Sequence, residues 1–138
     1  MEDKIVFEHI GEMAFKTEIG GHELKFDADK KVGGQDLGPK PKPMILVALA
    51  GCTGMDVVSL FKKMRVEYDD LKIEVIGELT EDHPKYYHKL MVEYHIWGSN
   101  VDKAKAEKAV NLSQERYCGV SYMLAKSSEL KYKIIYHN

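Results

Sequence analysis

The sequence is poor in cysteine and nearly balanced in charge: its 138 residues include two cysteines, and 20 Lys and Arg stand against 22 Asp and Glu. Two cysteines cannot form the disulfide framework of a small secreted protein, and they are too few for a cysteine-rich zinc site. A net charge of −2 lacks the basic surface that a nucleic-acid-binding protein needs. The single tryptophan and an aromatic content of 9% provide no row of stacking side chains for single strands. What remains is a globular protein whose two cysteines need an explanation.

The sequence also lacks a recognisable targeting segment. Its first ten residues, MEDKIVFEHI, are charged, whereas a signal peptide begins with a basic stretch and an apolar run. The stretch from Met44 to Phe61 is about as long as a membrane span, but Asp56 lies inside it and Lys62 follows it. We therefore expect a buried core helix, no membrane partner and a cytoplasmic protein, in which thiols stay reduced unless redox chemistry uses them.

Hydrophobic patterns indicate secondary structure along the whole chain. A length of 138 residues predicts a single domain, residues 1–138. Gly20-Gly21, between two alternating stretches, is typical of a tight hairpin turn. The expected order is strands within 4–27, a loop over 30–43, a helix over 43–65, strands over 71–79 and 89–96, a helix over 101–117, a short helix over 120–125 and a strand over 130–136. This order favours the α+β class with antiparallel sheets.

The expected helix over 43–65 is apolar nearly all round before Asp56, which is typical of a buried helix. Small residues surround Cys52 in this helix, among them Gly51 and Gly54. Each glycine inside a helix costs roughly 1 kcal/mol relative to alanine. We therefore expect another backbone to pack closely at this place, because such packing would offset the cost.

The two cysteines are the leading candidates for chemistry. Cys52 lies in the middle of a helix, and Cys118 lies where the next short helix is expected to start. The free N–H groups at a helix start favour the thiolate, which is the reactive form of cysteine. Simple packing is the ordinary alternative, since free cysteine is among the most buried residue types. A separation of 66 residues carries no motif of its own.

Other patterns that carry chemistry are weak. His83, His88 and His95 are spaced by five and seven residues, which matches neither the helical nor the strand spacing of zinc ligands. The glycine-rich loop over 33–43 does not contain GxGxxG or the Walker pattern, and no serine stands in GxSxG. These patterns therefore predict no metal, nucleotide or serine-based site.

Two segments, GGQDLGPKPKPMILVALAGC before and including Cys52 and ERYCGVS around Cys118, resemble the OsmC/Ohr family, the osmotically inducible and organic hydroperoxide resistance proteins. The first, GGQDLGPKPKPMILVALAGC, has a glycine-rich turn, a proline-containing approach and an apolar helix that reaches Ala-Gly-Cys at Cys52. The second, ERYCGVS, is similar to the family's Cys-Pro-Val-Ser segment around Cys118, with Gly119 in place of proline. The spacing of the two segments matches the family as well. The resemblance implies an OsmC-like fold, with antiparallel β-sheets wrapped around central helices in an intertwined homodimer.

The resemblance also implies an activity and a role for each cysteine. The family contains thiol-dependent peroxidases, so Cys52 would attack the O–O bond of a hydroperoxide and become a sulfenic acid. Cys118 would resolve it as a disulfide, which an external dithiol then reduces. On this resemblance the partners are a hydroperoxide, a dithiol reductant and a second copy of the chain, and no cofactor or metal is needed.

The sequence departs from the peroxidase branch of the family at the groups that activate the thiolate. Where that branch has a glutamate, residues 41–44 read Pro-Lys-Pro-Met. The branch also uses an arginine from its N-terminal strands, whereas the only arginines here are Arg65 and Arg116. Lys16, Lys42 or Arg116 are candidates to replace the missing charge network. The departure motivates an alternative, a non-catalytic OsmC-like protein that binds an apolar small molecule or a carrier thiol. A third hypothesis is a structural stress protein with inert thiols.

Overall fold

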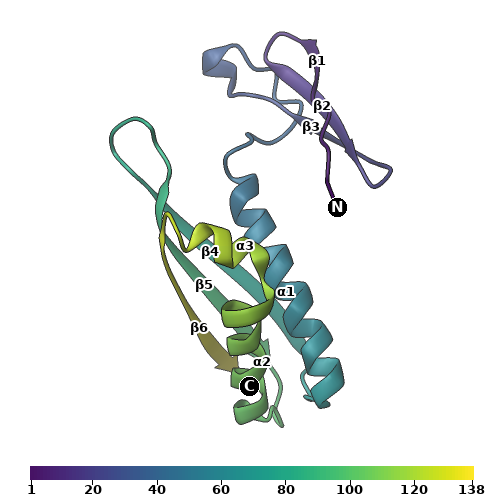
Figure 1. Ribbon diagram of the computed structural model, residues 1–138, viewed down its shortest axis with the longest axis vertical. Helices are drawn as coiled ribbons and strands as arrows, with labels where there is room; N and C mark the ends of the chain where they lie inside the picture. The colour runs from purple at the N-terminus through teal and green to yellow at the C-terminus, as the bar shows by residue number, and fades with distance from the viewer. The chain divides into compact units, whose positions relative to one another are not determined.

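The computed structural model describes residues 1–138, which form two compact units, Met1–Ile45 and Leu46–Asn138. Strands and helices occur in both (Figure 1), and the α+β class expected from the sequence is confirmed. The elements are β1 (Glu8–Gly11), β2 (Ala14–Ile19), β3 (His22–Phe26), the short 3-10 helix η1 (Lys30–Val32), α1 (Met44–Met64), β4 (Asp70–Leu79), β5 (Tyr87–Trp97), α2 (Lys103–Leu112), the π-helical turn η2 (Ser113–Tyr117), α3 (Gly119–Leu124) and β6 (Glu129–His137).

The N-terminal unit is a three-stranded antiparallel sheet in the order β1-β2-β3. The expected hairpin turn joins β2 to β3, and Gly20 and Gly21 both have positive φ, 56° and 82°. Tight hairpin turns need this left-handed backbone, which glycine adopts without strain. The ring of Phe7 stacks on that of Phe15, with centroids 4.8 Å apart. Local turn chemistry therefore determines this part of the fold.

One carboxylate organises the glycine-rich loop that follows β3. Asp27 is buried, and its oxygens accept hydrogen bonds from the N–H groups of Ala28, Gln35 and Leu37 at 2.8, 3.0 and 3.2 Å. Burial raises the pKa of Asp27, but the three N–H donors lower it more, so its pKa lies below the ordinary value. These donors already hold an anion that the chain itself supplies, which agrees with the rejection of this loop as a phosphate site.

The C-terminal unit contains the second sheet, in the order β4-β5-β6. β4 is antiparallel to β5, with Val75 opposite Val92. β6 runs parallel to β5, with Tyr132 opposite Val92, which corrects the expectation of sheets that are antiparallel throughout. The connection explains the difference: α2, η2 and α3 lie between β5 and β6 in the chain, and a helical crossover of this kind joins parallel neighbours.

Helices α1 and α2 pack against the second sheet (Figure 1) and form the core of the unit with it. Buried residues recur every fourth position along α1, which keeps them on one side of the helix. The core consists mainly of Leu49, Val57 and Phe61 from α1, Leu90, Val92, Tyr94 and Ile96 from β5, and Ala106, Ala109 and Val110 from α2. Cys52 directly precedes the buried Thr53, and Asp56 directly precedes the buried Val57. Both residues therefore lie at the border of the packed side of α1.

The opposite side of α1 is not covered by the other elements of the unit Leu46–Asn138. Val47, Met55 and Val58 are 57, 76 and 46% exposed. A Cβ added to Gly51 would meet no atom within 4 Å, whereas one added to Gly54 would contact Ile73 at 3.4 Å. The contact at Gly54 is with a side chain, so within the unit Leu46–Asn138 no backbone packs closely on either glycine.

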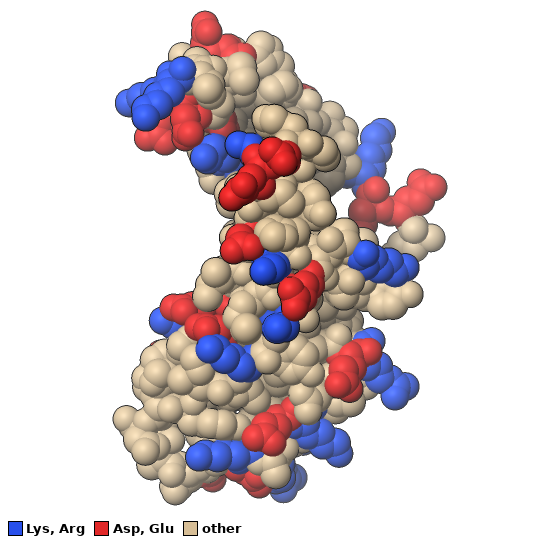
Figure 2. Space-filling view, turned by 90° about the vertical axis from the view of Figure 1, so that its left-hand side faces the viewer, with Lys and Arg blue, Asp and Glu red and all other residues tan.

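By length and composition, α1 qualifies as a candidate membrane span, with a mean hydropathy of 2.0 over an 18-residue window. Its packed side nevertheless belongs to the core of the unit, and Thr53 and Asp56 form hydrogen bonds there. A core helix of a globular protein passes the same test of length and composition, so this is weak evidence for a membrane span. Acidic and basic side chains are interspersed on the face that Figure 2 displays.

Candidate functional site

Cys118 lies at the junction between a wide helical turn and a new helix. The sequence predicted one helix over 101–117, but the regular helix α2 ends at Leu112 and the next turn, η2, is π-helical. The N–H of Cys118 donates to the carbonyl of Ser113 at 2.8 Å, and its Sγ accepts from the N–H of Ser121 at 3.4 Å. The prediction that Cys118 stands at the start of a helix is confirmed, since it is the N-cap of α3. Such π-turns are frequent at functional sites.

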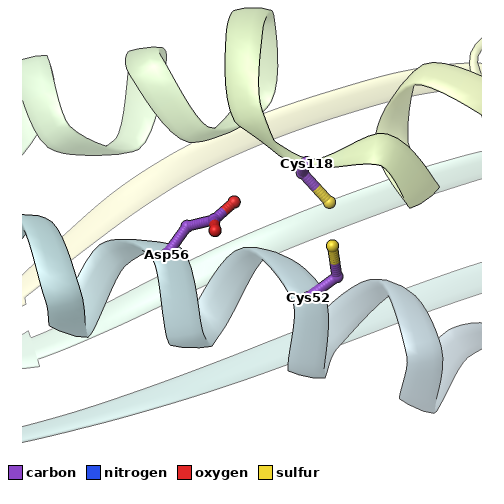
Figure 3. A group of neighbouring side chains, drawn as sticks. All are labelled: Cys52, Asp56 and Cys118. Atoms are coloured by element: carbon purple, nitrogen blue, oxygen red, sulfur yellow. The ribbon is translucent and has the colours of Figure 1, made fainter.

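The two cysteines face each other although 66 residues separate them (Figure 3). Both are free thiols; Cys52 is half-buried on α1, and Cys118 is 3% exposed. Their Sγ atoms and a carboxylate oxygen of Asp56 all lie within 4.8 Å of one another. The structure thus brings together both cysteines that the sequence singled out, and it adds Asp56 to the site.

Asp56 was not predicted to be a site residue, and in the sequence it stood out only as a charge within an apolar helix. The available signal was its spacing from Cys52, because residues i and i+4 lie on the same face of a helix. In Figure 3 the Asp56 side chain extends from α1 toward the two sulfurs. A carboxylate placed this way contributes negative charge to the thiol site.

The surroundings of Cys52 favour the protonated thiol. Burial raises the pKa of Cys52 above its ordinary value, and the hydrogen bond with Cys118 and the charges of Cys118 and Asp56 raise it further. The N–H of Val120 lowers it, but less than the other effects raise it. No Lys or Arg side chain of Leu46–Asn138 is among these influences, and the candidates Lys16 and Lys42 belong to the other unit, Met1–Ile45.

A chain of buried side-chain hydrogen bonds ends on Asp56. Ser113 Oγ donates to Asp56 Oδ2 at 3.0 Å, and a hydroxyl has one proton to donate. Ser113 must therefore accept from Thr53 Oγ1 at 2.7 Å, and Thr53 in turn accepts from the Tyr94 hydroxyl at 2.6 Å. The Tyr94 oxygen accepts from Gln114 Nε2 at 2.6 Å. All donors therefore point along one line toward the carboxylate.

The middle of this chain lies in the interior, where Thr53, Tyr94 and Ser113 are fully buried. Burial raises the pKa of Tyr94, although its hydrogen bonds with Thr53 and Gln114 lower it in part, so the side chain remains a neutral phenol that can donate. Buried polar groups are tolerated when each has a partner. The chain of donors thus holds Asp56 in one orientation.

Two groups of side chains offer metal-ligand atoms. Cys52, Cys118 and Asp56 present two sulfurs and a carboxylate oxygen, three donor atoms where a structural zinc site has four. The second group, Glu74, Glu93 and His95, lies on the second sheet. Its carboxylates are already paired with cations, Glu74 with Lys72 at 2.9 Å and Glu93 with Lys133 at 3.3 Å.

The three histidines considered in the sequence lie outside the thiol site. His88 Nε2 pairs with a Glu78 oxygen at 2.8 Å. His95 Nδ1 and His137 Nε2 are 2.9 Å apart, and the two rings stack. His83 lies in the connection between β4 and β5. None of them is positioned to act on the cysteines.

Comparison with known proteins places the chain in a family. The family model described as OsmC-like protein matches residues 33–133. Protein YhfA of Escherichia coli K12 is 32% identical over 107 residues, which are 78% of this chain and 77% of that protein. A crystal structure of a hypothetical protein from Aquifex aeolicus VF5 is 30% identical, with a TM-score of 0.83 over 100% of both chains.

A more distant likeness supports the fold alone. The organic hydroperoxide resistance protein OhrB of Bacillus subtilis is 19% identical and has a TM-score of 0.65 over 98% of both chains. The family match includes both cysteine segments and most of the chain, and the structural matches extend over its full length. On this evidence the chain belongs to the OsmC-like protein family.

Proposed function

We propose that the protein is a thiol-dependent peroxidase that reduces organic or inorganic hydroperoxides in defence against oxidative or osmotic stress. The observation that carries this proposal is the pair of free thiols, Cys52 and Cys118, whose sulfurs approach within 4.8 Å from different elements. Family membership supports the same conclusion, because several solved structures with this fold are named organic hydroperoxide resistance proteins.

The proposed reaction has three steps. Cys52 Sγ attacks a peroxide oxygen, the O–O bond breaks, and the products are a Cys52 sulfenic acid and an alcohol or water. Cys118 Sγ then attacks the sulfenic sulfur, a Cys52–Cys118 disulfide forms, and water leaves. An external dithiol reduces the disulfide and restores both thiols. A disulfide has an S–S length of about 2.05 Å, so from at most 4.8 Å the sulfurs need to approach by less than roughly 3 Å.

The first experiment is oxidation of the reduced wild-type protein by one equivalent of hydroperoxide. We expect the protein to lose two hydrogens and peptide mapping to identify a Cys52–Cys118 disulfide, because the two thiols face each other. Intact mass spectrometry measures the loss, and consumption of the peroxide is followed in parallel. Two free thiols alongside unconsumed peroxide would rule the proposal out.

One observation favours a second candidate function. The raised pKa of Cys52, with no Lys or Arg among the influences on it, suits a thiol that is not activated. That candidate is the non-catalytic OsmC-like protein that binds an apolar small molecule or a carrier thiol. It predicts that the oxidation experiment leaves both thiols free, so the same measurement separates the two functions.

We also propose that a second copy of the chain covers the exposed side of α1. This side carries an apolar stripe at helical spacing, formed by Val47, Gly51, Met55 and Val58. Gly51 offers open space where another backbone can approach closely, and this approach would offset the cost of glycine within a helix. A homodimer that buries this stripe would account for both the exposed apolar side chains and the glycine among them.

Replacing Met55 by glutamate tests the dimer. Met55 is 76% exposed in the chain, so the charge costs little in a monomer but is buried in the proposed interface. We expect a dimeric wild-type protein and a monomeric Met55→Glu variant by light scattering. The matched control is Ile76→Glu on β4, which is 54% exposed and should remain dimeric. A monomeric wild-type protein, or a Met55→Glu variant that stays dimeric, would contradict the interface.

The two compact units are proposed to be parts of a single OsmC-like domain, residues 1–138. The family match starts at residue 33 and so crosses the boundary between the units at Ile45. The N-terminal unit has 45 residues, a size at which a chain seldom buries enough apolar surface to fold alone. We assign the protein to the cytoplasm, where its two thiols would be kept reduced.

A further inference from the structure

The proposed peroxidase reaction needs a route for one proton. An ordinary cysteine has a pKa of about 8.5, so only a few per cent of it is thiolate at neutral pH. Burial, Cys118 and Asp56 raise the pKa of Cys52 further. A neighbouring group that accepts the thiol proton while the sulfur attacks would overcome this barrier.

We propose that Asp56 is the general base that accepts the Cys52 thiol proton as Sγ attacks the hydroperoxide and returns it to the leaving oxygen. This inference rests on the proposed peroxidase function. In the balanced step, Cys52–SH and ROOH give Cys52–SOH and ROH. The S–H and O–O bonds break, and an S–O and an O–H bond form. The sulfur is oxidised by two electrons, and the peroxide oxygens are reduced by the same two.

The geometry places Asp56 at the right position for this role. Cys52 and Asp56 are one helical turn apart on α1, and the carboxylate and both sulfurs lie within 4.8 Å of one another (Figure 3). Catalytic hydrogen bonds are often longer before substrate binds and shorten in the reactive complex. Asp56 Oδ2 is anchored by Ser113 at 3.0 Å, and no side chain donates to Oδ1, which is free to take the proton.

The buried chain of donors supports the same assignment. It consists of Gln114, Tyr94, Thr53 and Ser113, each donating to the next and the last to Asp56. Three fully buried hydroxyls in this order hold the Asp56 carboxylate in one fixed orientation. A general base needs this property, since it must be aimed before the substrate arrives.

No other group near the thiols fits this role as well. Cys118 is needed as a nucleophile for the sulfenic acid in the proposed second step. Tyr94 is a fully buried phenol behind Thr53 and already donates to it. Within the unit Leu46–Asn138, the titratable groups that face Cys52 are Asp56 on its own helix and Cys118 at the start of α3, with Tyr94 of β5 one hydrogen bond farther away.

The decisive variant is Asp56→Asn. If Asp56 is the general base, this variant should oxidise more slowly than wild type, whereas if Asp56 is only a nearby negative charge, the variant should oxidise faster. Removal of the negative charge makes the Cys52 thiolate easier to form, so alkylation by iodoacetamide should become faster, roughly tenfold for each unit by which the pKa falls. Loss of the base should nevertheless slow sulfenic acid formation at neutral pH by about 10²-fold or more. Stopped-flow oxidation and alkylation rates are compared on the same preparation, with the exposed Glu107→Gln on α2 as the control that changes neither rate.

A second measurement uses only the wild-type protein and therefore does not depend on how the variant folds. Alkylation requires the free thiolate, so its rate should rise roughly tenfold per pH unit below the pKa of Cys52. Oxidation assisted by Asp56 starts from the thiol and the carboxylate, so its rate should stay nearly constant over the same neutral range. Oxidation that rises in parallel with alkylation would overturn the inference.

The outcomes separate this inference from the proposed function. If wild-type protein forms the disulfide while Asp56→Asn oxidises as fast as wild type or faster, the peroxidase stands and Asp56 is not its base. If wild-type protein does not react with hydroperoxide at all, the peroxidase itself is wrong and the inference falls with it. Slower oxidation together with faster alkylation in Asp56→Asn supports both the peroxidase function and the role of Asp56 as its general base.

Discussion

Replacing Cys52 by serine should abolish hydroperoxide consumption, with a fall of more than roughly 10³-fold to the rate of the buffer alone. The reason is chemical, since the sulfur of the thiolate is the nucleophile and a serine hydroxyl does not form a stable oxidised acid. Serine is close to cysteine in size, and Cys52 is only half-buried, so the fold should be retained. Peroxide loss in the presence of excess dithiothreitol measures the effect.

Cys118→Ser is the matched control for this prediction. It keeps the attacking thiol and removes the resolving one, so it should consume one equivalent of peroxide and stop at a Cys52 sulfenic acid. A sulfenic acid reacts with dimedone, and the adduct is located by peptide mapping. An inert Cys118→Ser variant, together with a Cys52→Ser variant that consumes one equivalent of peroxide and carries the dimedone adduct on Cys118, would reverse the assignment of the two roles.

Replacing Phe61 by alanine should destabilise the protein by about 3–5 kcal/mol. Phe61 is fully buried on the packed side of α1, and its ring meets Tyr68 edge to face with centroids 5.2 Å apart. The truncated side chain leaves a cavity between α1 and the second sheet, where the interior cannot close fully around it. Urea unfolding followed by circular dichroism measures the change as a lower midpoint with an unchanged slope.

The control for this prediction is Tyr122→Ala, which removes another large aromatic side chain. Tyr122 is 68% exposed on α3, so its loss should change the free energy of unfolding by no more than about 0.5 kcal/mol. Equal destabilisation by both variants would contradict the packing of α1 described above. Because α1 carries both Cys52 and Asp56, Phe61→Ala should also loosen the thiol site.

Most elements of the fold were predictable because their signals are local. Alternation along β5 predicted a strand, and Leu90, Val92 and Ile96 are buried as that pattern requires. Gly20-Gly21 predicted a hairpin, because only the left-handed backbone makes so tight a turn. The parallel direction of β6 was not predicted, since strand direction depends on where the preceding helices pack, and the pattern along β6 carries no direction.

The candidate site was predictable only in part. Cys52 and Cys118 were found from their own chemistry and from the segments around them. Asp56 was not found, because a single carboxylate in an apolar helix has several ordinary explanations. The hydrogen bonds that hold Asp56 in place run through Ser113 and Tyr94, which are 57 and 38 residues away from it in the sequence. The wide turn η2, which ends just before Cys118, also has no clear sequence signal.

The sequence by itself determined the class, the family resemblance and the two cysteines, because composition, periodicity and short motifs are local properties. Only the tertiary structure decided that the two thiols meet, that a carboxylate joins them and that a line of buried donors ends on it. Contacts between distant segments depend on how α1, β5 and η2 pack, and packing is settled by shape and burial over the whole unit. The small number of cysteines excluded a disulfide scaffold, and the fold brings both of them together with Asp56 in one place.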